Sequence, residues 1–166
     1  MVRTIRGTSK GWFNLKIKKA PVPRKVLKCY QKRNNCLLIL GYEAYQDYLK
    51  SDVWKKIRAR KLSKHKYCLL CDNLATQVHH LDYNQDTLLG RKDFRLVQLC
   101  RNHHEEIEFE GTRKLSVREA TGKLFRLAEQ CERGKSWIKY MECEEDKYKK
   151  RKRRENRQKA KRGKSK

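Results

Sequence analysis

CLLCDNLATQVHHLDYNQDTLLGRKDFRLVQLCRNHHEEIE, residues 68–108, holds three of the seven cysteines and four of the five histidines of this 166-residue chain. Its first half carries a Cys-x2-Cys pair at 68–71 and a His pair at 79–80. Its second half carries Cys100, followed by a second His pair at 103–104. Cysteine and histidine are the residues that bind soft and borderline metal ions in proteins. This density of ligands indicates that metal binding organises the fold and that the rest of the chain supports it.

Four of these residues have the spacing of a structural zinc site. Cys68 and Cys71 form a C-x2-C pair, and Cys100 and His103 form a C-x2-H pair that begins after 28 intervening residues. Two such pairs suit tetrahedral Zn(II). Structural zinc contributes roughly 10 to 16 kcal/mol of binding free energy in zinc-finger peptides. The sequence therefore predicts a zinc staple that compensates for a small hydrophobic core.

The remaining histidines form a second candidate set that zinc does not explain. His79 and His80 lie in a β-like segment over residues 77–81, where alternation points neighbouring side chains to opposite faces unless the strand bends. His104 begins a helix, and Glu108, four residues on, shares its face. A hard divalent ion could therefore sit between His79, His104 and Glu108.

The order C-x2-C, V-H-H and L-V-x-L-C-x2-H-H, over about residues 45–109, resembles the HNH endonuclease family. The resemblance implies an α+β fold with a small zinc-stapled β-hairpin and helix, the ββα-metal core, and flanking helices. It implies hydrolysis of phosphodiester bonds in DNA with one catalytic Mg(II) or Mn(II) ion. By position, His79 and His104 match the metal ligands of the family and His80 matches its general base.

Two positions depart from the family pattern. Nine residues before His104, where the family has asparagine, this chain has Arg95. Four residues after His104, where the family has histidine, it has Glu108. A carboxylate is a reasonable ligand for Mg(II) or Mn(II). Arginine reverses the charge of the aspartate that some members carry, although Asp93 could take the role if the loop shifts. The Arg95 departure and the basic tails favour an alternative, a non-catalytic zinc-stapled nucleic-acid- or ribosome-binding protein derived from the HNH fold.

The net charge of +25 indicates a polyanionic partner, nucleic acid and in particular double-stranded DNA. Residues 1–33 hold eleven Lys/Arg and no Asp/Glu, and residues 147–166 hold thirteen Lys/Arg and one Glu. Residues 34–146 are nearly neutral, with twenty bases and eighteen acids. A third possibility is a protein-interaction adaptor whose tails meet an acidic partner. Candidate nucleic-acid contacts are Lys55, Lys56, Arg58, Arg95, Lys150, Arg151, Lys152, Arg153 and Arg154.

Local patterns predict several helices around the central stretch. Ser51 is a good N-cap for a helix from Asp52 to about His65, and Ser116 with Glu119 forms a capping box for a helix from Val117 to about Arg133. Gly134 interrupts that pattern, and another helical pattern starts at Ser136. The apolar run at 36–41 is either a buried strand or the last turn of a helix from Val26.

We expect four regions: a basic N-terminal arm with an apolar end over 1–40, the HNH-like domain over 41–112, a C-terminal helical extension over 113–146 and a basic disordered tail over 147–166. The chain shows no apolar run of membrane-spanning length and no signal peptide at its start. We therefore expect a soluble, cytoplasmic protein without membrane contact, nucleoid-associated in a bacterium. In that compartment the cysteines are ligands or free thiols.

Overall fold

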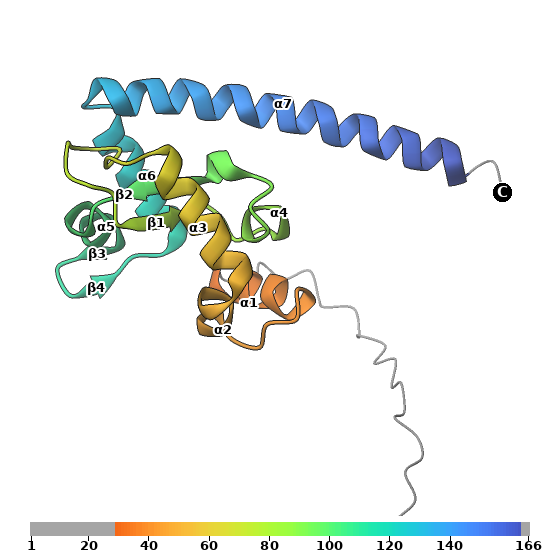
Figure 1. Cartoon of the computed structure of the whole chain (residues 1–166), viewed down its shortest axis with the longest axis horizontal. Helices are drawn as coiled ribbons and strands as arrows, with labels where there is room; N and C mark the ends of the chain where they lie inside the picture. Colours follow the sequence, from red (N-terminus) through yellow and green to blue (C-terminus); the bar gives the residue numbers. More distant parts are fainter. Residues whose placement is uncertain (1–28, 164–166) are drawn as a thin grey trace, which may run out of the picture.

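The computed structural model describes residues 29–163, which form an α+β structure with two two-stranded antiparallel sheets (Figure 1). Predictions for residues 1–28, including most of the N-terminal arm, lie outside the described residues. The elements are α1 (Cys29–Ile39), α2 (Tyr45–Lys50), α3 (Asp52–Lys64), β1 (Gln77–His80), α4 (Gln85–Leu88), the 3-10 helix η1 (Asp93–Arg95), β2 (Leu96–Leu99), α5 (Arg101–Glu108), β3 (Phe109–Glu110), β4 (Arg113–Lys114), α6 (Val117–Ala128) and α7 (Glu132–Gly163).

The β1–β2 pair is the centre of the fold. It is antiparallel, with Gln77 opposite Leu99 and His80 opposite Leu96, and α5 follows β2 directly. All four residues of β2 are buried, as expected for a strand covered on both faces. Opposite faces of this pair therefore contribute to different clusters of apolar side chains.

The two clusters take alternate residues of the strands, because successive side chains of a strand point to opposite faces. Val97 and Leu99 join the cluster with α5, α6 and the start of α7. Val78 and Leu96 join a second cluster with α1, α2 and α3. The buried members of the first cluster are Cys68, Leu69, Leu81, Phe94, Val97, Leu99, Cys100, Ile107, Leu124, Ala128, Trp137 and Met141.

The predicted helix starts agree with the structure. The Ser51 side chain accepts a hydrogen bond from the backbone N–H of Trp54 at the start of α3. Ser116 and Glu119 form the reciprocal capping box of α6. The run at 36–41 belongs to a helix and not to a strand, because α1 extends to Ile39 and buries Leu37 in the second cluster.

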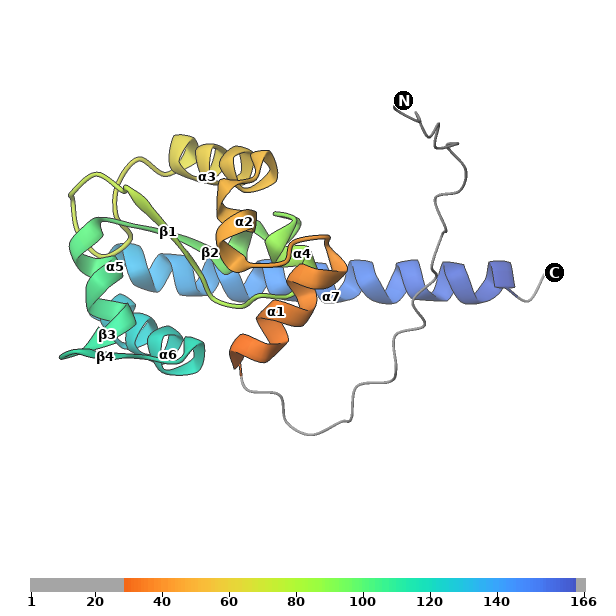
Figure 2. The ribbon, with the colours of Figure 1, turned by 90° about the horizontal axis from the view of Figure 1, so that it is seen from below.

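The prediction of a disordered tail over 147–166 is wrong for residues 147–163, which continue α7 (Figures 1 and 2). The segment cannot bury a core, but its packed first turns supply the nucleus that a lone helix would lack. Lysine, arginine, glutamate, glutamine and alanine then propagate a helix well. A stretch too polar to fold alone is therefore helical as an extension of a docked helix.

Gly134 does not break the helix either, because α7 begins before it, at Glu132. A Cβ atom built at Gly134 would lie 2.1 Å from the carbonyl oxygen of Ala128, at the end of α6. The glycine permits a close approach of α7 to α6. The predicted boundary at 112/113 also crosses a continuous core, since Leu124 and Trp137 share a cluster with Leu99. Among the described residues, no helix has the length and apolar character needed to cross a membrane.

Candidate metal centres and the pocket beside them

The predicted zinc ligands converge on one point. The sulfur of Cys71 lies 3.9 Å from that of Cys100, and Nδ1 of His103 lies 3.5 Å from the sulfur of Cys68 and 3.3 Å from that of Cys100. Tetrahedral Zn(II) with ordinary bond lengths places two sulfurs about 3.8 Å apart and a sulfur and a nitrogen about 3.6 Å apart. The donor set and its spacing fit a metal ion, and the geometry is consistent with structural zinc.

The backbone around this group is held from several sides. The N–H of Leu70 donates to the Cys68 sulfur at 3.4 Å. The Arg133 guanidinium, from the first turn of α7, donates to the carbonyl oxygens of Cys68 at 2.7 Å and Cys71 at 2.6 Å. A further bond of 2.6 Å reaches Asp72. The zinc group, defined as Cys68, Cys71, Cys100 and His103, and α7 therefore support each other.

A second group lies on the other side of the β1–α5 unit. Oε1 of Glu108 is 3.8 Å from Nδ1 of His79 and 3.7 Å from Nε2 of His104, and the three ligand atoms lie within 4.8 Å of one another. The expected grouping is therefore confirmed as geometry. His79 reaches α5 because it lies on the face of β1 that packs against that helix, while His80 faces α3.

The electrostatics of this group favour a bound cation. The His79 ring beside it, together with His104 and Lys114, holds the pKa of Glu108 at about 2 despite burial. Burial lowers the pKa of His104, which keeps its imidazole neutral. An ionised carboxylate between two imidazoles is a donor set that divalent transition ions and Mg(II) accept.

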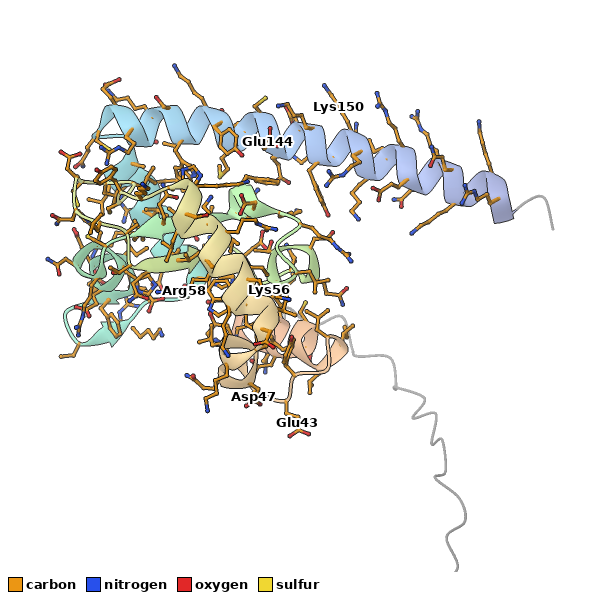
Figure 3. The ribbon with its side chains drawn as sticks, in the orientation of Figure 1. Glu43, Asp47, Lys56, Arg58, Glu144 and Lys150 are labelled. Carbon is orange, nitrogen blue, oxygen red and sulfur yellow. The ribbon has the colours of Figure 1, made fainter. Side chains whose placement is uncertain are left out.

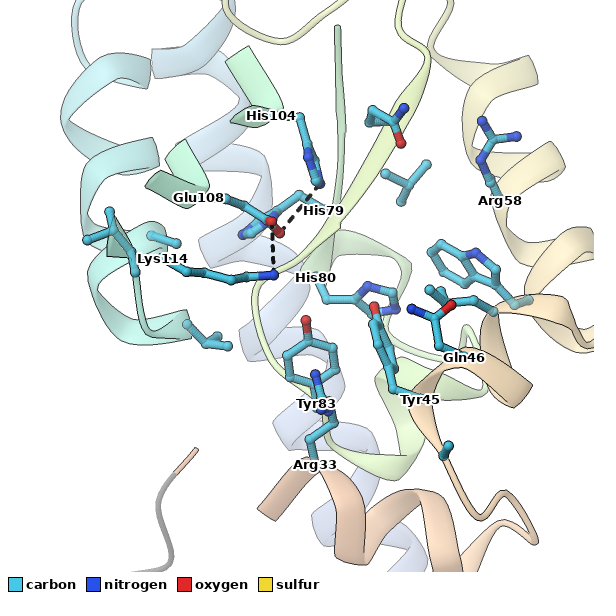
Figure 4. Close-up of a pocket in the computed structure, with 18 residues that line it drawn as sticks. Arg33, Tyr45, Gln46, Arg58, His79, His80, Tyr83, His104, Glu108 and Lys114 are labelled. Atoms are coloured by element: carbon cyan, nitrogen blue, oxygen red, sulfur yellow. Dashed lines mark ion pairs between the residues drawn. The ribbon is translucent and has the colours of Figure 1, made fainter. Parts of the chain in front are cut away.

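A pocket of about 590 Å³ opens beside this second group (Figure 4). His79, His104 and Glu108 form part of its wall, and Tyr45, Tyr83 and Trp54 form an aromatic part. Three cations line it, and Glu108 is the only carboxylate among its lining residues. An anionic ligand suits such a surface. The lining cations are Arg33, Arg58 and Lys114.

His80, the predicted general base, lies inside an aromatic stack. Its ring stacks on Trp54 at 4.6 Å and on Tyr83 at 5.2 Å between centroids, and it is only 3% exposed. Burial, followed by the neighbouring His79 and His104, lowers its pKa to about 3. Its Nε2 has no hydrogen-bond partner in the structure. The imidazole is therefore neutral at neutral pH, which leaves it able to accept a proton, although as a weak base.

Arg95, predicted to contact nucleic acid, is half-buried and paired with carboxylates of the protein itself. Its guanidinium binds Oε2 of Glu145 on α7 with bonds of 3.0 and 2.8 Å and lies 3.9 Å from Asp82. Arg95 therefore joins η1 to α7, and its charge is paired within the fold. Asp93 does not join the second ligand group, which consists of His79, His104 and Glu108.

The other predicted cations are more open. Lys55 is exposed and 3.5 Å from Asp52, and Lys56 is exposed on α3 (Figure 3). Arg58 donates to the carbonyl oxygen of Thr76 at 2.6 Å while it lines the pocket. On α7, Lys152 lies 3.4 Å from Asp86. Its neighbours Lys150, Arg151, Arg153 and Arg154 are exposed.

Sequence reasoning missed the residues that other elements bring to the site. Lys114, on β4, places its ammonium 3.4 Å from Oε2 of Glu108, whereas His79 and His104 lie near Oε1. The Arg33 guanidinium, from α1, lies 4.5 Å from the Tyr45 ring centroid. Arg133 supports the zinc group from α7. No spacing rule links these residues to the ligands, so no local signal identified them.

Comparison of the chain with protein-family models, with curated proteins and with solved structures gave no match.

Proposed function

We propose that the chain is a metal-dependent endonuclease of the HNH type, in which β1, β2 and α5 form a ββα-metal core. The observation that carries the proposal is the second ligand group and its position. A structural zinc explains only one of the two groups on this unit. The other is open to a pocket lined by three cations, as a site for a phosphodiester requires.

His79, His104 and Glu108 would hold the catalytic divalent ion, Mg(II) or Mn(II). When bound, the ion supplies Lewis-acid stabilisation of charge on the phosphodiester oxygens. Arg58 and Lys114 add positive charge at the pocket wall, where a phosphate group would approach. Their role is to attract and orient the substrate anion.

His80 would accept the proton that an attacking water loses. Its imidazole is neutral, and the unpartnered Nε2 can act as an acceptor. The stack with Trp54 and Tyr83 fixes the orientation of the ring. A general base typically contributes about 100-fold to 10,000-fold to the rate.

The test is incubation of supercoiled plasmid, single-stranded and branched DNA with purified protein in Mg(II) or Mn(II), with and without EDTA. We expect metal-dependent cleavage, and we expect His80→Ala to lower it by about 100-fold to 10,000-fold with zinc content and DNA binding retained. His65→Ala, which changes an exposed histidine, is the matched control. Equal cleavage by His80→Ala would remove His80 from the mechanism.

A second candidate is a non-catalytic zinc-stapled nucleic-acid- or ribosome-binding protein. The burial of His80 at 3% exposure favours it, because a base so enclosed is difficult for water to reach. The engagement of Arg95 by Glu145 also favours it, since the position of the family asparagine then has a structural use. Absence of cleavage on every substrate, with retained binding, would support this candidate over the first.

A further inference from the structure

The C-terminal half of α7 is a basic helix fixed to a rigid body. Its anchors begin with Trp137 and Met141, which pack in the first core cluster, and continue with Glu145, which binds Arg95. The Tyr148 hydroxyl donates to Asp86, and its ring meets Phe94 at 6.2 Å. Lys152 also reaches Asp86, and Figure 1 shows the remaining turns extending beyond the body. The direction of the helix is therefore set by the fold.

The bases of this segment surround the helix. Residues 147–162 include eleven Lys/Arg and a single acid, Glu155. At 100° per residue, no sector wider than about 60° lacks a base. Figure 3 shows side chains standing out on both sides of the ribbon, with Lys150 pointing away from the body. After Tyr148 the only apolar residue is Ala160, so the segment has no stripe with which to pack against a protein.

We propose that residues 147–163 of α7 bind duplex DNA by lying in its major groove. A helix that rests on one phosphate ridge needs bases on one side only, whereas this helix offers them on all sides. The major groove of B-form DNA is about 12 Å wide, admits an α-helix and is bordered by phosphates of both strands. The segment is about 25 Å long, about twice the width of the groove, so several of its turns can lie between the two phosphate ridges.

Duplex RNA does not offer the same site, because the major groove of its A-form helix is too narrow and deep for side chains to enter. The expected contacts are mainly to phosphates, so they position the protein without specifying a sequence. The inference rests on the nucleic-acid-binding part of the proposed function and does not require cleavage.

The decisive comparison is between Asn156→Pro and Asn156→Ala in the full chain. Asn156 is exposed and lies four residues beyond Lys152, so both variants should keep the body intact. They carry the same charge, but proline breaks or kinks the helix. We expect Asn156→Pro to bind duplex DNA about fivefold to tenfold more weakly, because the four bases beyond the break leave the common axis. Thermal unfolding and zinc content check that each variant is folded.

Binding is measured by fluorescence anisotropy with a 20-base-pair DNA duplex, an RNA duplex of the same sequence and the single DNA strand, without added Mg(II) or Mn(II). We expect the order duplex DNA, then single strand, then duplex RNA. Equal affinity of the two Asn156 variants would show a flexible polycation and overturn the inference. Equal or tighter binding of duplex RNA would also overturn it.

The two proposals fail separately. If plasmid is cleaved but the two Asn156 variants bind duplex DNA equally, the endonuclease stands and the groove-binding helix does not. If the Asn156 effect is present but nothing is cleaved, the helix stands and the catalytic proposal fails. If none of the three nucleic acids binds, both proposals fail.

Discussion

The two ligand groups of this protein share one β-hairpin and one helix, yet their surroundings differ. Cys68 and Cys100 are buried in the core, Cys71 and His103 are half-buried, and Arg133 supports the group from α7. His79, His104 and Glu108 face a pocket with Lys114 at its edge. The adjacent His103 and His104 divide between them, because successive helix residues point about 100° apart. The difference shows how one small scaffold can hold two candidate ligand groups in different surroundings, one backed by α7 and one beside a pocket.

The largest effect on stability is expected from loss of the zinc group. Cys68→Ser should lose bound zinc and the cooperative thermal transition, because zinc contributes roughly 10 to 16 kcal/mol in zinc-finger peptides and the core here is small. Zinc content by mass spectrometry and unfolding by circular dichroism measure this. Cys143→Ser, at an exposed cysteine, is the control and should behave as the parent protein. A stable, zinc-free Cys68→Ser protein would show that the group is dispensable.

Loss of the second group, His79, His104 and Glu108, should affect metal binding and leave stability unchanged. Glu108→Ala should weaken Mn(II) binding by at least about 100-fold, since removing a ligand exceeds the effect of removing its supporting partners. Zinc content and thermal stability should change little. Isothermal titration with Mn(II) measures the affinity, and Glu105→Ala, on the exposed side of the same helix, is the control. Unchanged Mn(II) affinity would rule out Glu108 as a ligand.

Removing the contacts of α7 with the zinc group should have a moderate effect on stability. Arg133→Met removes the donors to the carbonyl oxygens of Cys68 and Cys71 and should lower the free energy of unfolding by about 1 to 2 kcal/mol. Urea unfolding measures it. Lys135→Met removes only an exposed ion pair with Glu132 and should leave the free energy of unfolding close to that of the parent protein. If both variants lose the same stability, Arg133 has no special role.

The smallest effect, on metal affinity, is expected from Lys114, beside the second group. Lys114→Met removes a positive charge 3.4 Å from Oε2 of Glu108, so Mn(II) should bind about twofold to fivefold more tightly. Lys114→Arg keeps the charge and should bind Mn(II) as the parent does. The same titration measures both. Identical affinities for the Met and Arg variants would show that the ammonium does not compete with the metal.

Sequence alone identified what depends on local spacing and residue type. The zinc ligands, the caps at Ser51 and Ser116 and the grouping of His104 with Glu108 all follow from positions close in the chain or from a donor set specific to metals. It did not identify the helix over 147–163, because composition describes an isolated segment and not one continued from a docked helix. Sequence alone also could not identify the ion pair of Arg95 with Glu145, since the two residues lie 50 positions apart.

Residue chemistry by itself determined that this chain carries two sets of residues that could hold a metal ion and a large positive charge at its ends. Only the tertiary structure decided which side chains surround each set. The crossing of α7 over the zinc group, the approach of Lys114 to Glu108 and the enclosure of His80 all join residues from separate elements. The physical reason is that ligand spacing is a local property of the backbone, whereas burial, charge neighbours and access to solvent arise only when the elements pack.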